Sequence, residues 1–196
     1  MSGARASAPA SAPAHLDTIR HDPPRGLERG PATPVVVAGL GNEFRRDDAV
    51  GPLVAEQSAA AVPWVHDVGP LADPLDLLGR WDGAELAVII DAVVSGAPPG
   101  TVSVLELPLG RVTGDGAGNV VGVEGVGRCT STHGIGLVRV VHLARLLGQA
   151  PRRVAVVGIE GRDFGRGTGL SPAVAAAVPE AMRRIVELTR EVATCV

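Results

Sequence analysis

From residue 34 onward, short apolar runs alternate with segments in which apolar residues recur every three or four positions. Short β-branched runs predict buried strands, and the wider spacing predicts helices with one apolar face. We therefore expect strands at 35–38, 64–68, 86–91, 101–107 and 154–159, and helices at 48–61, 74–81, 134–148 and from 172 onward. This alternation predicts a three-layer α/β/α domain over residues 34–196, with a mostly parallel sheet.

Two neighbouring strands allow a more detailed prediction. The run 86–91 is almost continuously apolar, which is typical of a central parallel strand covered on both faces. The link from Asp91 to Thr101 is too short for a helical crossover. The strand at 101–107 should therefore run antiparallel or lie at an edge of the sheet.

The last helix has the clearest start signal, because Ser171 stands at the N-cap position and Pro172 at the first helical position. Pro179 falls inside this helix and is expected to kink it. In the helix at 134–148, one face is expected to be apolar, formed by Leu137, Val140, Val141, Ala144 and Leu147. Between the strands and these helices, residues 110–128 are rich in glycine and without periodicity, so we expect them to be mobile.

Composition narrows the class of protein. A chain of 196 residues suits one domain, and its net charge of −3 with 2% aromatic residues argues against nucleic-acid binding. Two cysteines, Cys129 and Cys195, are too few for a disulfide framework and favour a reducing cytoplasm. No apolar run approaches the roughly 18–20 residues that span a bilayer, so no membrane association is expected. Residues 1–33 are rich in Ala, Ser, Pro and Arg and predict a disordered extension.

The most informative stretch is 35–51, which reads as strand, glycine turn, acidic pair and helix. A glycine turn made for phosphate would avoid fixed negative charge, yet this one leads into Asp47 and Asp48. Ligands of open α/β sheets bind outside the carboxyl ends of the strands, where Asp48, Asp91 and His133 are all expected. Two carboxylates and one imidazole are a suitable donor set for an open divalent-cation site.

Each of these residues also has a structural interpretation. Asp48 could cap its helix, Asp91 could cap a turn, and His133 could be a surface residue at a helix start. Taken singly, the structural and functional interpretations have similar weight. Three such residues at one sheet edge favour a site. Asp47 is assigned to structure, in loop hydrogen bonds.

Other chemistries fit less well. In the pattern Gly39-x-Gly41-x-x-Phe44, a phenylalanine replaces the third glycine of a dinucleotide-binding turn. A Walker A loop and a Gly-x-Ser-x-Gly elbow are absent from the sequence. Cys129 lies four residues before His133, but nothing else in the sequence orients that histidine for a thiolate pair. His66 is a candidate only for indirect support of the site.

The motifs together resemble those of the nickel-iron hydrogenase maturation endopeptidases, over a region from about residue 34 to about residue 188. The residues that carry the resemblance are Gly39-Leu40-Gly41-Asn42-x4-Asp47-Asp48-x2-Gly51, Ile90-Asp91-Ala92, Thr132-His133-x2-Gly136-Leu137, Gly158-Ile159-Glu160 and Leu170-Ser171-Pro172-x-Val174. The order and spacing of this set are what make it specific.

The resemblance implies a twisted five-stranded sheet between helices and the removal of a short C-terminal peptide from the hydrogenase large-subunit precursor. It also implies that Asp48, Asp91 and His133 bind nickel that arrives with the substrate and is not held permanently. A cytoplasmic monomer is expected. The alternative is a non-proteolytic checkpoint protein that binds the nickel-loaded precursor and releases it.

The chain departs from the family pattern at two places. Members commonly carry Asp-Gly-Gly-Thr after the second strand, where this chain has Asp67-Val68-Gly69-Pro70. Glu160 is often followed by proline, whereas Gly161 follows here. The first departure leaves open how a substrate segment docks beside the second strand.

Overall fold

The computed structural model describes residues 35–107 and 134–193. The predictions for residues 1–33, residues 110–128, the two cysteines and His133 fall outside these ranges. Within them, five strands form one sheet in the order β2-β1-β3-β5-β4. The strands are β1 (Val35–Gly39), β2 (Val65–Asp67), β3 (Leu86–Val93), β4 (Val102–Leu107) and β5 (Arg153–Glu160).

The pairing of the strands follows the prediction. Strands β2, β1, β3 and β5 run parallel, and β4 pairs antiparallel with β5 at the edge. The short link between β3 and β4 allows no helical crossover, so the chain can only turn back. The predicted mostly parallel five-stranded sheet and its antiparallel edge strand are confirmed.

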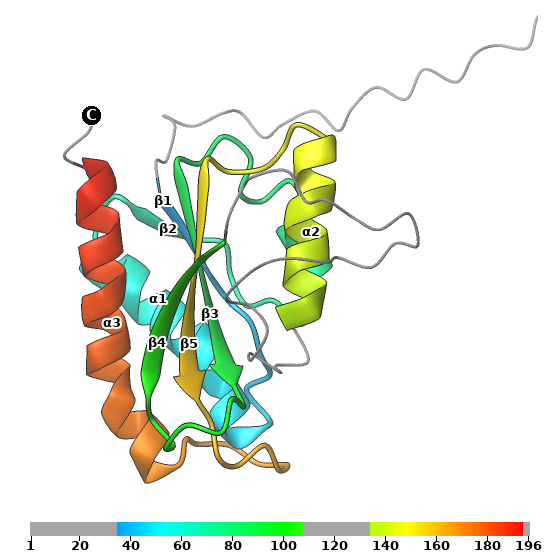
Figure 1. Ribbon diagram of the computed structural model, residues 1–196. Helices are drawn as coiled ribbons and strands as arrows, with labels where there is room; N and C mark the ends of the chain where they lie inside the picture. The colour runs from blue at the N-terminus through cyan, green and yellow to red at the C-terminus, as the bar shows by residue number, and fades with distance from the viewer. Residues whose placement is uncertain (1–34, 108–133, 194–196) are drawn as a thin grey trace, which may run out of the picture. The chain divides into compact units, whose positions relative to one another are not determined.

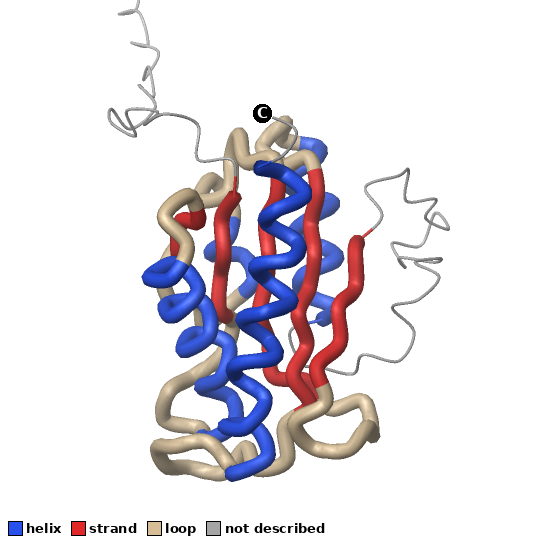
Figure 2. Tube along the Cα trace, turned by 90° about the vertical axis from the view of Figure 1, so that its left-hand side faces the viewer, coloured by secondary structure: helices blue, strands red, loops and turns tan. Residues whose placement is uncertain are grey.

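In the described part of the chain, α-helices cover both faces of the sheet (Figure 1). The helices α1 (Val50–Ala61) and α3 (Pro172–Ala193) lie on one face, and α2 (Gly134–Leu146) lies on the other. Figure 2 looks onto the first of these faces, where α3 passes in front of the strands. Two 3-10 helices, η1 (Arg46–Ala49) and η2 (Pro74–Leu77), follow β1 and β2. The described part is thus the predicted α/β/α sandwich.

Strand β3 is the centre of both hydrophobic cores, and all eight of its residues are buried. Successive side chains of a strand point to opposite faces. Val88 and Ile90 accordingly pack with α1 and α3, whereas Ala87 and Ile89 pack with α2. This double burial explains why the run reads as continuously apolar and not as alternating.

Three predicted elements differ in detail. The helix expected at 48–61 begins with the tighter turn η1 and becomes α-helical only at Val50. The helix expected at 74–81 is reduced to η2, and Gly79 follows it with a φ of 78°. Leu147 was expected on the buried face of α2 but is 56% exposed, because the helix ends at Leu146. The other four predicted residues of that face are buried.

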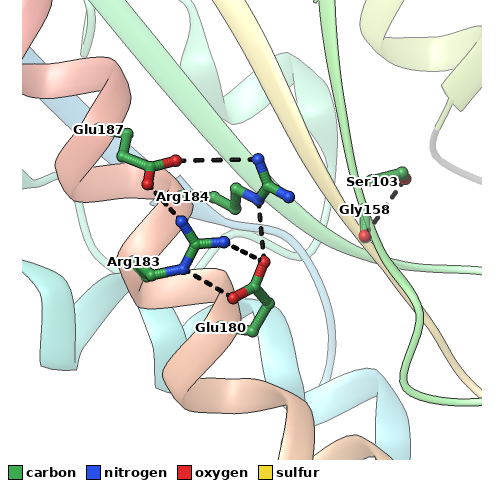
Figure 3. A network of polar contacts seen from close by, with 6 residues as sticks. All are labelled: Ser103, Gly158, Glu180, Arg183, Arg184 and Glu187. Atoms are coloured by element: carbon green, nitrogen blue, oxygen red, sulfur yellow. Dashed lines mark hydrogen bonds and ion pairs between the residues drawn. The ribbon is translucent and has the colours of Figure 1, made fainter.

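The outer surface of α3 carries a network of ion pairs, shown in Figure 3. Arg183 and Arg184 both pair with Glu180 and Glu187, one helical turn before and after them. All four side chains are well exposed, and such pairs contribute little each. The helix, which contains Pro179, is therefore held to the sheet mainly by its apolar face. Among the described helices, none is both long and apolar enough to cross a membrane.

Candidate functional site

The loop after β1 folds tightly against the acidic pair. Gly41 has a φ of 136°, and a Cβ atom on it would lie 1.9 Å from the carbonyl oxygen of Asp48. Only glycine tolerates both the backbone conformation and the contact. The backbone N–H of Leu40 donates to the carbonyl oxygen of Ile90 at 2.8 Å, so the loop is also tied to β3. The glycine turn thereby brings Asp48 to the carboxyl end of β1, beside β3.

Asp48 is buried, with 6% of its surface exposed. Its Oδ2 accepts a hydrogen bond from the backbone N–H of Asn42 at 3.1 Å and lies 4.0 Å from the guanidinium of Arg45. No side chain in the described residues caps η1 or α1. The helix-cap interpretation of Asp48 is therefore wrong, and its carboxylate faces the turn between β1 and η1.

Asp91 is also buried, with 3% of its surface exposed. It lies in β3 opposite Gly158 of β5, and the strand continues two residues beyond it to Val93. The turn after the strand is held by Glu160, whose carboxylate accepts hydrogen bonds from Ser95 and Gly96. Asp91 was predicted to end its strand, but it lies two residues before the end. The carboxylate that holds the turn is that of Glu160.

The alternation of β3 places Asp91 on the face of the sheet that α2 covers, together with Ala87 and Ile89. The first turn of α2 lies at the same end of the sheet as the carboxyl ends of the parallel strands (Figure 1). His133 immediately precedes that turn but lies outside the described residues. Its predicted place beside Asp91 therefore stays a prediction.

Asp48 and Asp91 come together at one edge of the sheet. Strand β1 pairs with β3 up to Gly39 and Ile90, and η1, which carries Asp48, contacts β3. Among the described histidines, cysteines and acids, no group of three or more could hold a metal ion. These two buried carboxylates, one in η1 and one in β3, can bind a cation only with a further ligand, from the chain or from the substrate.

Asp47, the neighbour of Asp48, joins two loops that are distant in the sequence. Its carboxylate accepts hydrogen bonds from the backbone N–H groups of Arg162, Asp163 and Ser171 at 2.6–2.9 Å. The hydroxyl of Ser171 donates to the same carboxylate at 2.9 Å. The predicted role in loop hydrogen bonds is confirmed, and the donors lie in the loop between β5 and α3.

Burial alone would raise the pKa of Asp47, but the N–H donors of Ser171, Asp163 and Arg162 and the Ser171 hydroxyl outweigh it and lower the pKa below its ordinary value of 3.8. Its contribution to stability is therefore full above that value and is lost as the pH falls through the lowered pKa. Asp47→Asn is expected to reduce the free energy of unfolding by about 2–4 kcal/mol at pH 7. The difference from the wild type should shrink at about pH 2–3.

Urea denaturation at both pH values measures this difference. Asp163→Asn, at a half-buried acid of the same loop whose side chain pairs with Arg46 at 3.3 Å, serves as the control and should change stability by less than about 1 kcal/mol. A wild-type-like Asp47→Asn at pH 7 would show that the four hydrogen bonds do not hold the loops.

The remaining predicted candidate in the described residues is not part of this edge. His66 is exposed on β2, and β1 separates it from β3.

The sequence analysis did not identify the role of Glu160 or the contact between Ser171 and Asp47. That contact joins residues 124 positions apart, and no local pattern in either segment could have indicated it.

Comparisons with known proteins show what the chain is similar to. A family model described as hydrogenase maturation protease matches residues 120–188. The chain is 26% identical to the hydrogenase 2 maturation protease of Escherichia coli K12 over 164 residues, which cover 80% of this chain and 91% of that protein. It is 28% identical to the hydrogenase expression/formation protein HoxM of Cupriavidus necator, covering 80% and 74% of the two chains.

The fold agrees as well. The solved structure of the hydrogenase maturating endopeptidase HybD from E. coli superimposes with a TM-score of 0.63 at 25% identity, covering 80% of this chain and 92% of that one. Family model, relatives and solved structure thus converge on one family, the same one that the glycine turn, the acidic pair and Asp91 resemble in sequence. In sequence and in fold, the chain is therefore similar to the hydrogenase maturation proteases.

Proposed function

We propose that this protein is an endopeptidase that removes a short C-terminal peptide from the nickel-loaded large-subunit precursor of a nickel-iron hydrogenase. The observation that carries the proposal is the pair of buried carboxylates, Asp48 in η1 and Asp91 in β3, at the ligand-binding edge of the sheet. Carboxylate oxygens are suitable ligands for a divalent cation. The names of the related proteins support the peptidase class.

The nickel is part of the substrate in this proposal. Asp48 and Asp91 supply two oxygen ligands, and His133, at the start of α2, supplies an imidazole nitrogen, which suits nickel. The imidazole must be neutral to bind a metal. The donor set fits a metal that also keeps ligands from the precursor, because three protein ligands leave coordination positions open.

The residues of this chain then act by binding and orientation. Recognition of the loaded metal by Asp48 and Asp91 brings the adjoining peptide bond to the carboxyl edge of the sheet, where η1 and the loop after β1 surround it. Holding the reacting groups in this way can contribute several kcal/mol to catalysis. The metal polarises a carbonyl or a water when the precursor is bound.

The test is the intact mass of a co-expressed large subunit, with and without nickel, in the presence of the wild type or His133→Ala. A loss of mass that requires nickel and disappears with His133→Ala is the expected result. The variant should keep the thermal stability of the wild type, since the proposed role of His133 is that of a ligand.

An unchanged mass beside the nickel-loaded partner would overturn the peptidase proposal. A pull-down of the same pair then identifies the alternative. Stable binding of the loaded precursor without shortening would indicate a checkpoint protein, and absence of binding would show that the precursor is not the partner.

A further inference from the structure

Beside the candidate site lies an exposed surface formed by two loops, residues 42–46 and 162–167, which we call the two-loop platform. Phe44 is the most exposed aromatic residue among those described, at 62%. Arg45 and Arg46 follow it, with 54% and 47% of their side chains exposed. Arg162 and Arg166 in the second loop are exposed as well. The platform thus combines one exposed aromatic side chain with four exposed arginines.

The platform is held rigidly by the backbone. The N–H of Arg46 donates to the carbonyl oxygen of Gly167 at 3.0 Å, and the N–H of Gly167 donates to the carbonyl oxygen of Phe44 at 2.9 Å. The N–H of Asp47 donates to the carbonyl oxygen of Asp163 at 3.0 Å. In return, the carboxylate of Asp47 accepts a hydrogen bond from the N–H of Asp163. A surface ordered in advance loses little conformational entropy when a partner binds.

Its charge is opposite to that of the chain as a whole. The platform carries four arginines and two acids, Glu43 and Asp163. Asp163 is already paired with Arg46. Asp47 and Asp48 are buried beneath the loops. The complete chain carries a net charge of −3, so a basic surface at this edge is a local feature.

We propose that the two-loop platform docks an acidic segment of the precursor that also carries an apolar residue. The inference rests on the proposed function, because a protein substrate whose peptide bond reaches Asp48 must pass the loops that carry it. Arginine binds carboxylates through two parallel hydrogen bonds, and arginine and aromatic residues dominate the binding energy of protein interfaces. The charges steer the acidic segment, and Phe44 supplies the apolar contact.

The test is the steady-state processing of purified nickel-loaded precursor by Arg162→Glu/Arg166→Glu. We expect KM to rise about tenfold or more while kcat stays within about twofold of the wild type. The wild-type KM should rise with salt up to and beyond an ionic strength of about 0.15 M, and the KM of the variant should respond weakly. Phe44→Ala, which removes no charge, should also raise KM but keep the wild-type response to salt.

The control is Arg145→Glu/Arg152→Glu, which makes the same change in net charge at the opposite edge of the sheet. Arg145 lies in the last turn of α2, and Arg152 directly precedes β5. This variant should keep the wild-type KM. A KM for Arg162→Glu/Arg166→Glu equal to that of the control would overturn the docking inference, while processing by the wild type would leave the proposed function standing.

If the wild type binds the precursor without processing it, the dissociation constant replaces KM in the same comparison. An unchanged dissociation constant for Arg162→Glu/Arg166→Glu would then overturn the inference, as would a wild type that does not bind. Tighter binding by the charge-reversed variant would identify a basic partner segment and would equally contradict it. Thermal unfolding of all variants checks that they fold.

Discussion

Replacing Asp91 by asparagine is expected to abolish processing of the nickel-loaded precursor, with a fall in kcat/KM of at least about a thousandfold. Asparagine keeps the shape of the side chain but removes the negative charge that would bind the divalent cation. Asp91 is 3% exposed, so its carboxylate has little contact with bulk water. Rates are measured by the intact mass of the precursor over time.

The fold should survive this substitution. Asparagine is nearly isosteric with aspartate, and we expect the melting temperature to change by less than about 4 °C, which corresponds to about 1 kcal/mol in a domain of this size. The loss of rate would then belong to the chemistry and not to unfolding. Full processing by Asp91→Asn would remove Asp91 from the proposed site.

Glu160→Gln is the matched control. Glu160 is also 3% exposed and lies at the end of β5, the neighbouring strand, opposite Val93. Its carboxylate is occupied by donors from Ser95 and Gly96, at 2.7–3.0 Å. Glu160→Gln should therefore lower stability while kcat/KM stays within about tenfold of the wild type. The two variants separate a buried acid that holds a turn from one that serves the reaction.

The sequence predicted those features that depend on local pattern and chain length. The apolar run 86–91 predicted a central strand covered on both faces, and β3 is buried along its whole length. The short link after it predicted the antiparallel course of β4. Both follow from constraints that act within a few residues, namely side-chain burial and the reach of the chain.

Features that depend on distant segments could not be predicted in this way. Asp47 was expected to form loop hydrogen bonds, but its side-chain partners at 162–171 could not be named, because only the packing of α3 against α1 and β5 brings them near. Leu147 continues the apolar spacing of its helix, yet Gly148, with a φ of 69°, follows it and the side chain is exposed. Periodicity indicates which face is apolar but not where a helix ends.

The candidate site contains features that local pattern predicts and features that depend on distant segments. The sequence identified the glycine turn, Asp48 and Asp91, because the ends of parallel strands meet at one edge whatever the details of packing. The support given by Glu160 to the turn after β3 was not identified, since an acid that ends a strand reads as a candidate ligand and as a turn partner equally well. Only the hydrogen bonds from Ser95 and Gly96 distinguish the two.

The second large effect is expected at Gly51, where α1 crosses the ends of β1 and β3. A Cβ atom at this position would lie 2.2 Å from the carbonyl oxygen of Leu40 and 2.7 Å from that of Ile90. Both are backbone atoms, so no side-chain rotation relieves the contact and the helix must move away from the sheet. Gly51→Ala is expected to lower the free energy of unfolding by about 3 kcal/mol or more, and the melting temperature by about 6–12 °C.

Gly136→Ala in α2 is the matched control, because it is the same substitution in another helix. There the nearest atom to the new Cβ would be Cγ of Pro74 at 3.4 Å, an ordinary contact. Helix propensity alone favours alanine over glycine by about 1 kcal/mol, so Gly136→Ala should be neutral or stabilising. If Gly51→Ala matches it in urea denaturation, the close approach of α1 to the strands does not limit the fold.

The same substitution should also affect the reaction. The 3-10 helix η1 directly precedes α1, so moving α1 displaces η1 and with it Asp48. Asp91 stays within β3. A displacement of about 1 Å between reacting groups can cost about a hundredfold in rate. Gly51→Ala should therefore process the precursor slowly even at temperatures where it is fully folded, and Gly136→Ala should not. A folded Gly51→Ala with the wild-type rate would show that the spacing between the two carboxylates is not set by this contact.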